Sequence, residues 1–187
     1  MSLAKLAKIQ ENRVLGIDAS TRSVAFCLFD NKTPIKWGEV FFDGGDVYER
    51  ILDAKKKVHA IAKTFPSDFV ALEAAVMVRS ANTGLKMAYV FGAIMGELIA
   101  DGRRVVEVHP LKWQGAIGNP NLSKLEKQKI KLENPGKSEN WYKNKGREFR
   151  KNRTKDFVKN NYNIVLESDN VADAFGIAYF ASTALLR

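Results

Sequence analysis

A glutamate inside a short apolar run is the feature that most restricts the fold of this chain. Glu73 is embedded in segment 69–74 (FVALEA), whose nearly continuous apolar pattern is typical of a strand buried on both faces. A buried glutamate without a partner is strongly destabilising, so the fold has to supply either a partner or a function for it. Asp18 stands in a similar place, because it ends the apolar run that begins at Val14.

The expected order of helices and strands predicts a mixed α/β fold. Three strands come first, and the turn residues between them predict an antiparallel meander. The expected strands are 14–18, 23–30, 35–42, 69–74 and 104–108, and the expected helices are 47–64, 81–100 and 169–186. This order resembles the ribonuclease H-like fold. That fold is a mixed five-stranded sheet, with three antiparallel strands and then two parallel ones, flanked by helices.

In that fold the first and fourth strands are parallel neighbours, which would place Asp18 beside Glu73 where open α/β sheets bind their ligands. Asp173 joins them if the last helix packs across this edge of the sheet. Three carboxylates in a partly buried place repel one another and lose hydration, so they need a cation. Oxygen ligands favour Mg²⁺ or Mn²⁺ over zinc, and two such ions would hold a phosphodiester for hydrolysis.

Length and composition narrow the class of protein further. With 187 residues, 45% of them hydrophobic, chain 1–187 is expected to form a single domain with a polar N-terminal tail at 1–12. The single cysteine, Cys27, lies in an apolar strand, which excludes an internal disulfide framework and predicts a core position. No run of about 18 apolar residues or secretory pattern is evident. We therefore expect a protein of the cytoplasm of a bacterial or phage-infected cell, without a membrane partner.

Almost all of the net charge of +9 lies in one part of the chain. Residues 121–160 hold thirteen Lys and Arg against five Asp and Glu, a balance of +8. We call residues 119–160 the basic segment and predict a helical insertion before the last helix. Its cations would meet phosphates and its aromatic side chains would stack on an unpaired base, whereas the alternative is a solvated helical pair whose aromatics pack on the domain. Without DNA we expect disorder here, especially at 134–136.

The side chains expected to bind DNA are mostly cations of the basic segment. Arg79 and Lys112 precede the basic segment, and Lys112, shortly after the expected fifth strand, is predicted to contact a phosphate. The full set is Arg79, Lys112, Lys124, Lys143, Lys145, Arg147, Arg150, Lys151, Arg153, Trp141 and Tyr142.

Three motifs resemble those of the RuvC-type Holliday junction resolvases, in the same order and with the same elements between them. They are GIDAS around Asp18, ALEAAVMVRSANTGLKM around Glu73 and DNVADAFGIAYFA around Asp173. The resemblance implies a homodimeric, Mg²⁺-dependent endonuclease that makes paired nicks in four-way DNA junctions and leaves 5′-phosphate and 3′-hydroxyl ends. It also implies that these three carboxylates are catalytic metal ligands.

The chain departs from that family at two positions near the motifs. The family commonly carries a fourth carboxylate three residues before the last one, and Asn170 stands at that position here. Asp169 lies on the same helical face as Asp173, so either Asp169, as a further catalytic carboxylate, or Asn170 completes the metal site. Val76 replaces an aromatic residue that many relatives carry, which leaves base stacking from that position open.

Other interpretations remain for the same residues. Asp18 with Ser20 also fits an Asx turn, and Asp173 also fits a residue placed to favour the start of a helix. The segment GIDASTRSVAFCLFDN resembles the first phosphate loop of actin-like kinases and ATPases, which however need two such domains. Asn170 keeps open a junction-binding or RNA-binding relative with an incomplete site. The long helix 81–100 is apolar on more than one stripe, so we expect it to serve both the core and a dimer face.

Overall fold

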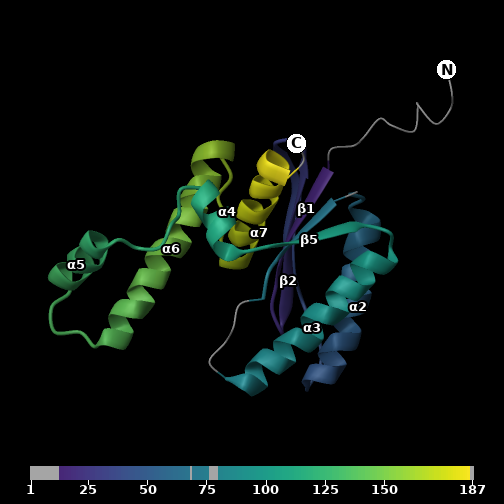
Figure 1. Cartoon of the computed structure of the whole chain (residues 1–187), viewed down its shortest axis with the longest axis horizontal. Coiled ribbons are helices and arrows are strands. Elements are labelled where there is room, and N and C mark those ends of the chain that lie inside the picture. Colours follow the sequence, from purple (N-terminus) through teal and green to yellow (C-terminus); the bar gives the residue numbers. More distant parts are fainter. Residues whose placement is uncertain (1–12, 68, 76–79, 186–187) are drawn as a thin grey trace.

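The computed structural model of the protein describes residues 13–67, 69–75 and 80–185, which contain one five-stranded sheet with helices on both faces (Figure 1). The strands lie in the order β3-β2-β1-β4-β5. The central strand β1 is antiparallel to β2 and parallel to β4, as the sequence predicts. The strands are β1 (Arg13–Ala19), β2 (Ser23–Asp30), β3 (Thr33–Phe41), β4 (Phe69–Glu73) and β5 (Arg104–Val108).

Helices on the two faces of the sheet cover two separate hydrophobic cores. On one face, α2 (Val47–Thr64) and α3 (Ala81–Ala100) lie side by side and cover apolar residues such as Leu15, Ile17 and Leu72. On the other face, α7 (Asp169–Phe180) covers Val14, Ala71 and their neighbours. Strands β1, β2 and β4 are therefore buried on both faces, which is the reason for their continuous apolar pattern. Cys27 is fully buried in β2, as predicted.

Close packing brings α7 directly against β1 at Gly16. A Cβ atom at Gly16 would lie 2.5 Å from the backbone oxygen of Ala174 and 2.7 Å from the Cβ atom of Ala178. Only glycine allows this approach, since real Cβ atoms almost never come so near to another heavy atom. Side chains alternate along a strand, so Asp18, two residues further on, points to the same face as Gly16 and toward the start of α7.

Three local features differ from the sequence prediction. Strand β3 begins at Thr33, because Asn31 adopts a left-handed conformation (φ 54°) and closes the hairpin within two residues. Helix α7 ends at Phe180 and continues as a π-helical turn, Ala181–Leu185, where one long helix was expected. The short helix α4 (Pro110–Ala116) was not predicted. His109 caps this helix by accepting a hydrogen bond from the Leu111 backbone N–H at 3.2 Å.

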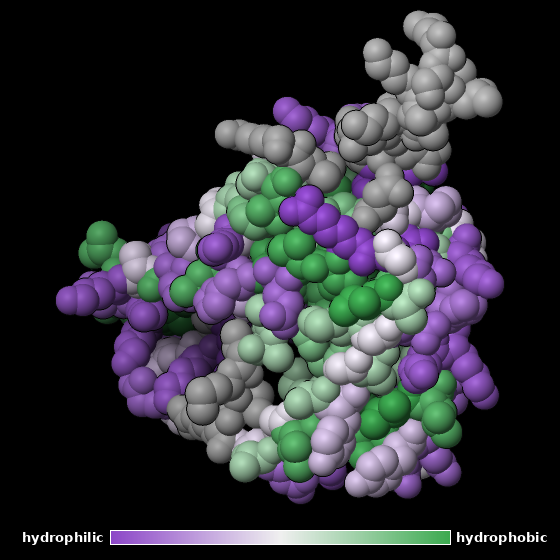
Figure 2. Space-filling view, turned by 45° about the vertical axis from the view of Figure 1, so that its right-hand side comes forward, coloured by the Kyte–Doolittle hydropathy of each residue, from purple (hydrophilic) through white to green (hydrophobic). Residues whose placement is uncertain are grey.

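Helix α3 is the most exposed apolar helix of the described chain. By length and composition alone it could cross a membrane, although one such helix is weak evidence for a span; 17% of the relevant window is buried inside the protein. Val90, Ile94 and Leu98 pack against α2, and the Glu97 carboxylate accepts a hydrogen bond from Nδ1 of His59 on α2 at 2.8 Å. These contacts fix α3 to the domain. Its other side adds to the hydrophobic surface that Figure 2 shows on this side of the molecule.

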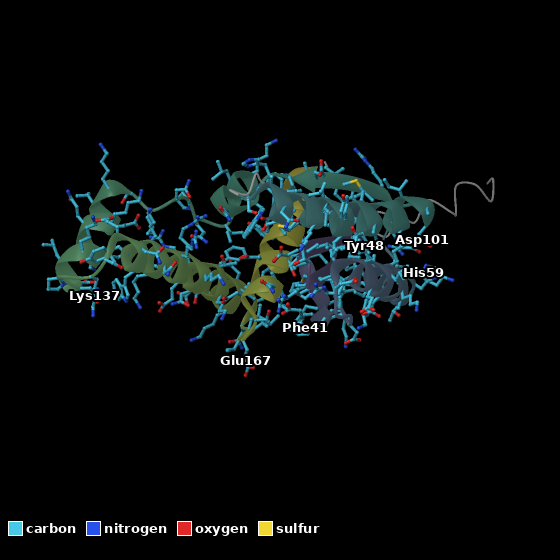
Figure 3. The ribbon with its side chains drawn as sticks, turned by 90° about the horizontal axis from the view of Figure 1, so that it is seen from below. Phe41, Tyr48, His59, Asp101, Lys137 and Glu167 are labelled. Atoms are coloured by element: carbon cyan, nitrogen blue, oxygen red, sulfur yellow. The ribbon has the colours of Figure 1, made fainter. Side chains whose placement is uncertain are left out.

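The basic segment forms two helices, α5 (Lys124–Glu133) and α6 (Glu139–Tyr162), where we expected disorder at 134–136. Ser123 and Glu126 form a capping box at the start of α5. The Tyr142 hydroxyl donates to the backbone oxygen of Asn134 at 2.6 Å, and this bond ties the turn between the helices to α6. Figure 3 shows the helical pair projecting from the domain, with Lys137 at its far end.

Candidate functional site

Asp18, Glu73 and Asp173 come together at one edge of the sheet, as predicted from the expected fold. The last residues paired between β1 and β4 are Ile17 and Leu72, so Asp18 and Glu73 are the next residues on two adjacent parallel strands. Both side chains point to the face covered by α7, as Gly16 and Ala71 do two residues earlier. Asp173 lies in the second turn of α7, which starts at this edge.

The Asx-turn interpretation of Asp18 is wrong for this structure. The turn between β1 and β2 is closed by Ser20, whose hydroxyl oxygen accepts from the backbone N–H groups of Arg22 and Ser23 at 3.1 and 2.9 Å. Asp18 instead lies within β1, opposite Ala25 of β2. Its carboxylate is therefore left for another role.

Burial disfavours ionisation of these carboxylates when no cation is near, and charge repulsion adds to the effect at Asp18 and Asp173. Burial raises the pKa of Asp18 well above its usual value, and the negative charges of Glu73, Asp173 and Glu39 raise it further. Burial and then the charge of Glu73 raise the pKa of Asp173 to about 7. Burial also raises the pKa of Glu73. A positive charge placed among these groups would relieve their mutual repulsion.

The donor set of this edge fits a hard divalent cation. Its side chains offer carboxylate oxygens, which Mg²⁺ and Mn²⁺ prefer, and they carry more negative charge than nearby cations balance. Within the described ranges, no three Asp, Glu, His or Cys side chains already converge on one point as a metal cage does. The side chains that could hold the ion would therefore turn toward it on binding, with Asp18 central among them.

Trp113 of α4 holds Glu73 in place and was missed by the sequence reasoning. Its indole Nε1 donates a hydrogen bond to Glu73 Oε2 at 3.0 Å, and its ring is almost fully buried. Gly176 of α7 makes room for that ring, because a Cβ atom there would lie 2.5 Å from it. Trp113 follows the expected fifth strand, 104–108, by five residues, but nothing in the sequence tied it to Glu73.

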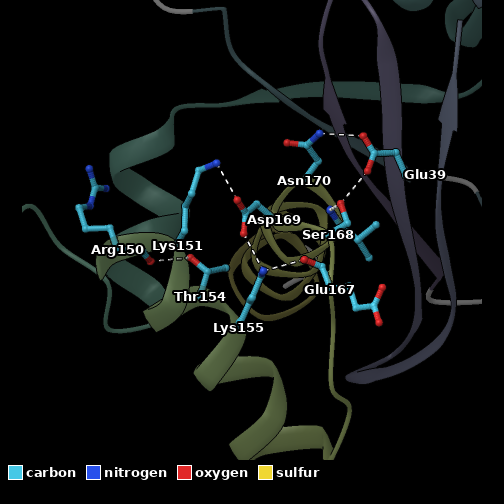
Figure 4. Close-up of polar contacts among 10 residues, drawn as sticks. Glu39, Arg150, Lys151, Thr154, Lys155, Glu167, Ser168, Asp169 and Asn170 are labelled. Atoms are coloured by element: carbon cyan, nitrogen blue, oxygen red, sulfur yellow. Dashed lines mark hydrogen bonds and ion pairs between the residues drawn. The ribbon is translucent and has the colours of Figure 1, made fainter. Parts of the chain in front are cut away.

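The two candidates for a fourth ligand have different surroundings (Figure 4). Asp169 is held by two cations of α6, with Lys151 Nζ at 2.7 Å and Lys155 Nζ at 2.8 Å from its carboxylate oxygens. Partial burial acts against ionisation there, but the hydrogen bonds from both lysines lower the pKa of Asp169. Asn170 instead donates from Nδ2 to Glu39 Oε1 of β3 at 2.7 Å. Glu39 is a further residue of this edge that the sequence reasoning missed.

The residues expected to bind DNA are spread over α4, α5 and α6. Arg79, like Val76, lies outside the described residues, and Lys112 is exposed on α4. Several cations of α6 already pair within the chain, including Arg150 with Gln114 and Arg153 with Glu126. Trp141 and Tyr142 pack edge to face with ring centres 5.5 Å apart. A groove of about 690 Å³ lies between α5 and α6, and the cations that line it are Lys124, Lys127, Lys131, Lys143, Arg147 and Arg150.

The raised pKa of Asp173 predicts that the metal-free protein loses stability as the pH rises. Between its unfolded value near 3.8 and its folded value of about 7, the folded state binds more protons than the unfolded state, so the free energy of unfolding falls across this window. In EDTA we expect the melting temperature to drop by about 5 °C or more between pH 5 and pH 8. Asp173→Asn should flatten this dependence. Asp156→Asn, at an exposed position on α6, should keep it, and equal slopes in all three proteins would contradict the prediction.

Comparisons with known proteins are made by fold, because no family model and no curated protein matches this sequence. Thermus thermophilus RuvC in complex with a Holliday junction substrate superposes with a TM-score of 0.68 at 15% identity, over 92% of this chain and 95% of that chain. A second T. thermophilus RuvC structure gives a TM-score of 0.66 at 16% identity over the same shares. The yeast mitochondrial Holliday junction resolvase Ydc2 gives 0.53 at 13% identity, over 95% of this chain and 81% of that one. At these identities the likeness concerns the fold, and the chain has the ribonuclease H-like fold of the RuvC-type resolvases.

Proposed function

We propose that this protein is a metal-dependent endonuclease that resolves four-way DNA junctions by hydrolysing paired phosphodiester bonds. The observation that carries the proposal is the meeting of Asp18, Glu73 and Asp173 at one edge of a RuvC-type fold, where their repulsion calls for a cation. A structural neighbour with this fold is bound to a Holliday junction, which supports the same class of substrate here. The cytoplasm of a bacterial or phage-infected cell is the proposed location.

Asp18, Glu73 and Asp173 would hold Mg²⁺ or Mn²⁺, with two ions per site as the proposed number. Such ions supply activation of the attacking water and stabilisation of the leaving 3′ oxygen. The chain's own contribution is orientation. Trp113 fixes one oxygen of Glu73 by its 3.0 Å hydrogen bond, and the packing of α7 on Gly16 fixes the position of Asp173. Lys151 of α6 places a positive charge near Asp18 and Asp173 that offsets part of the rise in their pKa values, and this charge would attract an incoming phosphate.

The basic segment is the proposed DNA-binding arm. Its two helices project from the domain beside the edge that carries the carboxylates, since Lys151 and Lys155 of α6 reach Asp169 at the start of α7. The groove between α5 and α6 is lined by six cations of the same segment. Phosphates of a duplex arm would bind along it by neutralising Lys and Arg side chains.

A second copy of this chain is the proposed occupant of the exposed face of α3. Leu85, Tyr89 and Ile99 are exposed by 52%, 42% and 56%, and with Gly92 and Gly96 between them they form one stripe at heptad spacing. A stripe of this kind is unfavourable in water and fits a self-complementary interface. Paired nicks in a four-way junction also require two active sites, which one copy of this domain does not supply.

Loss of the central carboxylate tests the proposed activity. With Mg²⁺ or Mn²⁺, the unsubstituted protein should nick a synthetic four-way junction symmetrically and leave duplex and single strands of the same sequence intact. Asp18→Asn should slow cleavage at least about 100-fold, because it weakens the binding of the ion that lowers the barrier, while junction binding persists. Asp30→Asn, at the end of the neighbouring strand β2, is the matched control and should cleave normally.

The outcomes of that assay separate the competing functions. Junction binding without cleavage in either metal would favour the incomplete, junction-binding relative, whose motivating observation is Asn170 in place of a carboxylate. Binding of structured RNA in preference to the junction would favour the RNA-binding form of that relative. Nucleotide hydrolysis in the absence of DNA would favour the phosphate-loop interpretation of the first strand.

Salt dependence tests the basic segment as the DNA-binding arm. Replacing Lys124, Lys143 and Arg147 by Ala in the Asp18→Asn background should weaken junction binding and reduce the slope of log Kd against log salt by about 2 to 3, since each phosphate contact contributes about 0.9. The control replaces Lys32, Lys56 and Lys63, which are exposed outside the basic segment. A slope reduced equally by both triple substitutions would contradict the assignment.

Sedimentation tests the dimer. The unsubstituted protein should sediment as a dimer at micromolar concentration. The double substitution Leu85→Glu and Tyr89→Glu should give a folded monomer, because a dimer would have to bury the new charges in its interface. Leu125→Glu, at a residue 77% exposed on α5, should leave the dimer intact. A monomeric unsubstituted protein at concentrations where it cleaves junctions would rule out this use of α3.

A further inference from the structure

Glu39 is a carboxylate on the outermost antiparallel strand that nevertheless faces the proposed metal site. It pairs with Ala25 of β2, which in turn pairs with Asp18 of β1, so the three residues form one row across the sheet. Two residues earlier, Trp37 packs against Phe175 of α7 with ring centres 5.2 Å apart. Glu39 therefore points to the α7 side as well, and its charge reaches Asp18, whose pKa it raises.

The Glu39 carboxylate binds two side chains at the start of α7, and Figure 4 shows both contacts. Oε2 accepts from the Ser168 hydroxyl at 2.6 Å, and Oε1 accepts from Asn170 Nδ2 at 2.7 Å. Ser168 is also the N-cap of α7 and accepts from the Val171 backbone N–H at 3.2 Å. The outermost strand β3 thus fixes the start of the helix that carries Asp173.

These contacts determine which way the Asn170 amide faces. An ionised carboxylate can only accept hydrogen bonds, so the amide must present its NH₂ group to Glu39 and turn its carbonyl oxygen away. Figure 4 shows this oxygen directed away from Glu39. Asn170 and Asp173 are three residues apart on α7 and share one helical face. Asp169, the other candidate, has its two carboxylate oxygens bound by Lys151 and Lys155.

We propose that Glu39 is a positioning residue that orients Asn170, so that the amide oxygen of Asn170 serves as the neutral fourth ligand beside Asp173. This inference rests on the proposed function only in assuming that the edge binds a divalent cation. A carboxylate at position 170 would stand 2.7 Å from Glu39 and repel it, which explains why an amide is compatible with this chain. In this chain the additional carboxylate near the site is therefore Glu39 of β3, whereas position 170 of α7 carries a neutral amide.

Paired substitutions test this arrangement with metal affinity as the main readout. Titration of the unsubstituted protein with Mn²⁺ in a calorimeter, without DNA, gives the reference affinity. Glu39→Gln lets the amide at position 170 turn over and should weaken Mn²⁺ binding about tenfold. Asn170→Asp alone should lower the melting temperature in EDTA through repulsion by Glu39.

The double variant Glu39→Gln/Asn170→Asp provides the rescue. The new amide at position 39 can donate to the new carboxylate at position 170, so the melting temperature in EDTA and the Mn²⁺ affinity should both return at least to the reference values. Glu167→Gln removes an exposed carboxylate from the same turn and should change neither quantity.

The outcomes separate this inference from the proposed function. Unchanged Mn²⁺ affinity in Glu39→Gln, failure of the double variant to recover, or lack of Mn²⁺ binding by the unsubstituted protein would overturn the positioning role. Mn²⁺ binding that follows the expected pattern in a protein that cleaves no junction would instead overturn the proposed nuclease and leave the role of Glu39 standing.

Discussion

The contact of α7 with Gly16 is the constraint on which the rest of the site depends. Strand β1 is the centre of the sheet, and a side chain at Gly16 would push α7 away from it, since a Cβ atom there would meet the helix backbone at 2.5 Å. With the helix seated, its first turns lie over the carboxyl ends of β1 and β4. Asp173 then approaches Asp18 and Glu73 closely enough to raise the pKa of Asp18. The same close packing places Gly176 against Trp113, which holds Glu73.

The packing of α7 on β1 brings the carboxylates of Asp18, Glu73 and Asp173 together, and their mutual repulsion destabilises the folded protein locally. Three carboxylates are partly buried at one edge, and burial is the largest cause of the raised pKa of each of them. A cation bound among the carboxylates would relieve the repulsion between them, so the local loss of stability and the capacity to bind a cation have a common origin in that repulsion.

The surroundings of the carboxylates come from distant parts of the chain. Trp113 of α4 supports Glu73, Glu39 of β3 supports Asn170, and two lysines of α6 bind Asp169. The basic segment therefore contributes to this edge as well as projecting from the domain. Its ion pair with Asp169 draws one candidate ligand toward α6, while Glu39 draws the next residue toward β3. Asp169 and Asn170, which are neighbours in the first turn of α7, therefore bind side chains from different elements.

The sequence by itself determined the strands and helices and the three central carboxylates, and the resemblance of their order to the ribonuclease H-like fold implied the strand order. Apolar runs of four to eight residues, helical periodicity and turn residues are local signals, and Glu73 inside FVALE is visible without any structure. Only the tertiary structure decided how the carboxylates are supported. The contacts of Trp113 with Glu73 and of Glu39 with Asn170 join residues 40 and 131 positions apart, and no local pattern encodes such pairs. The contact that holds the turn at 134–136 was missed for a similar reason, because the composition of the basic segment is polar and the turn is bonded by Tyr142, eight residues away. Side-chain orientation at an edge of a sheet is set by which helices pack there, and that packing exists only once the chain has folded.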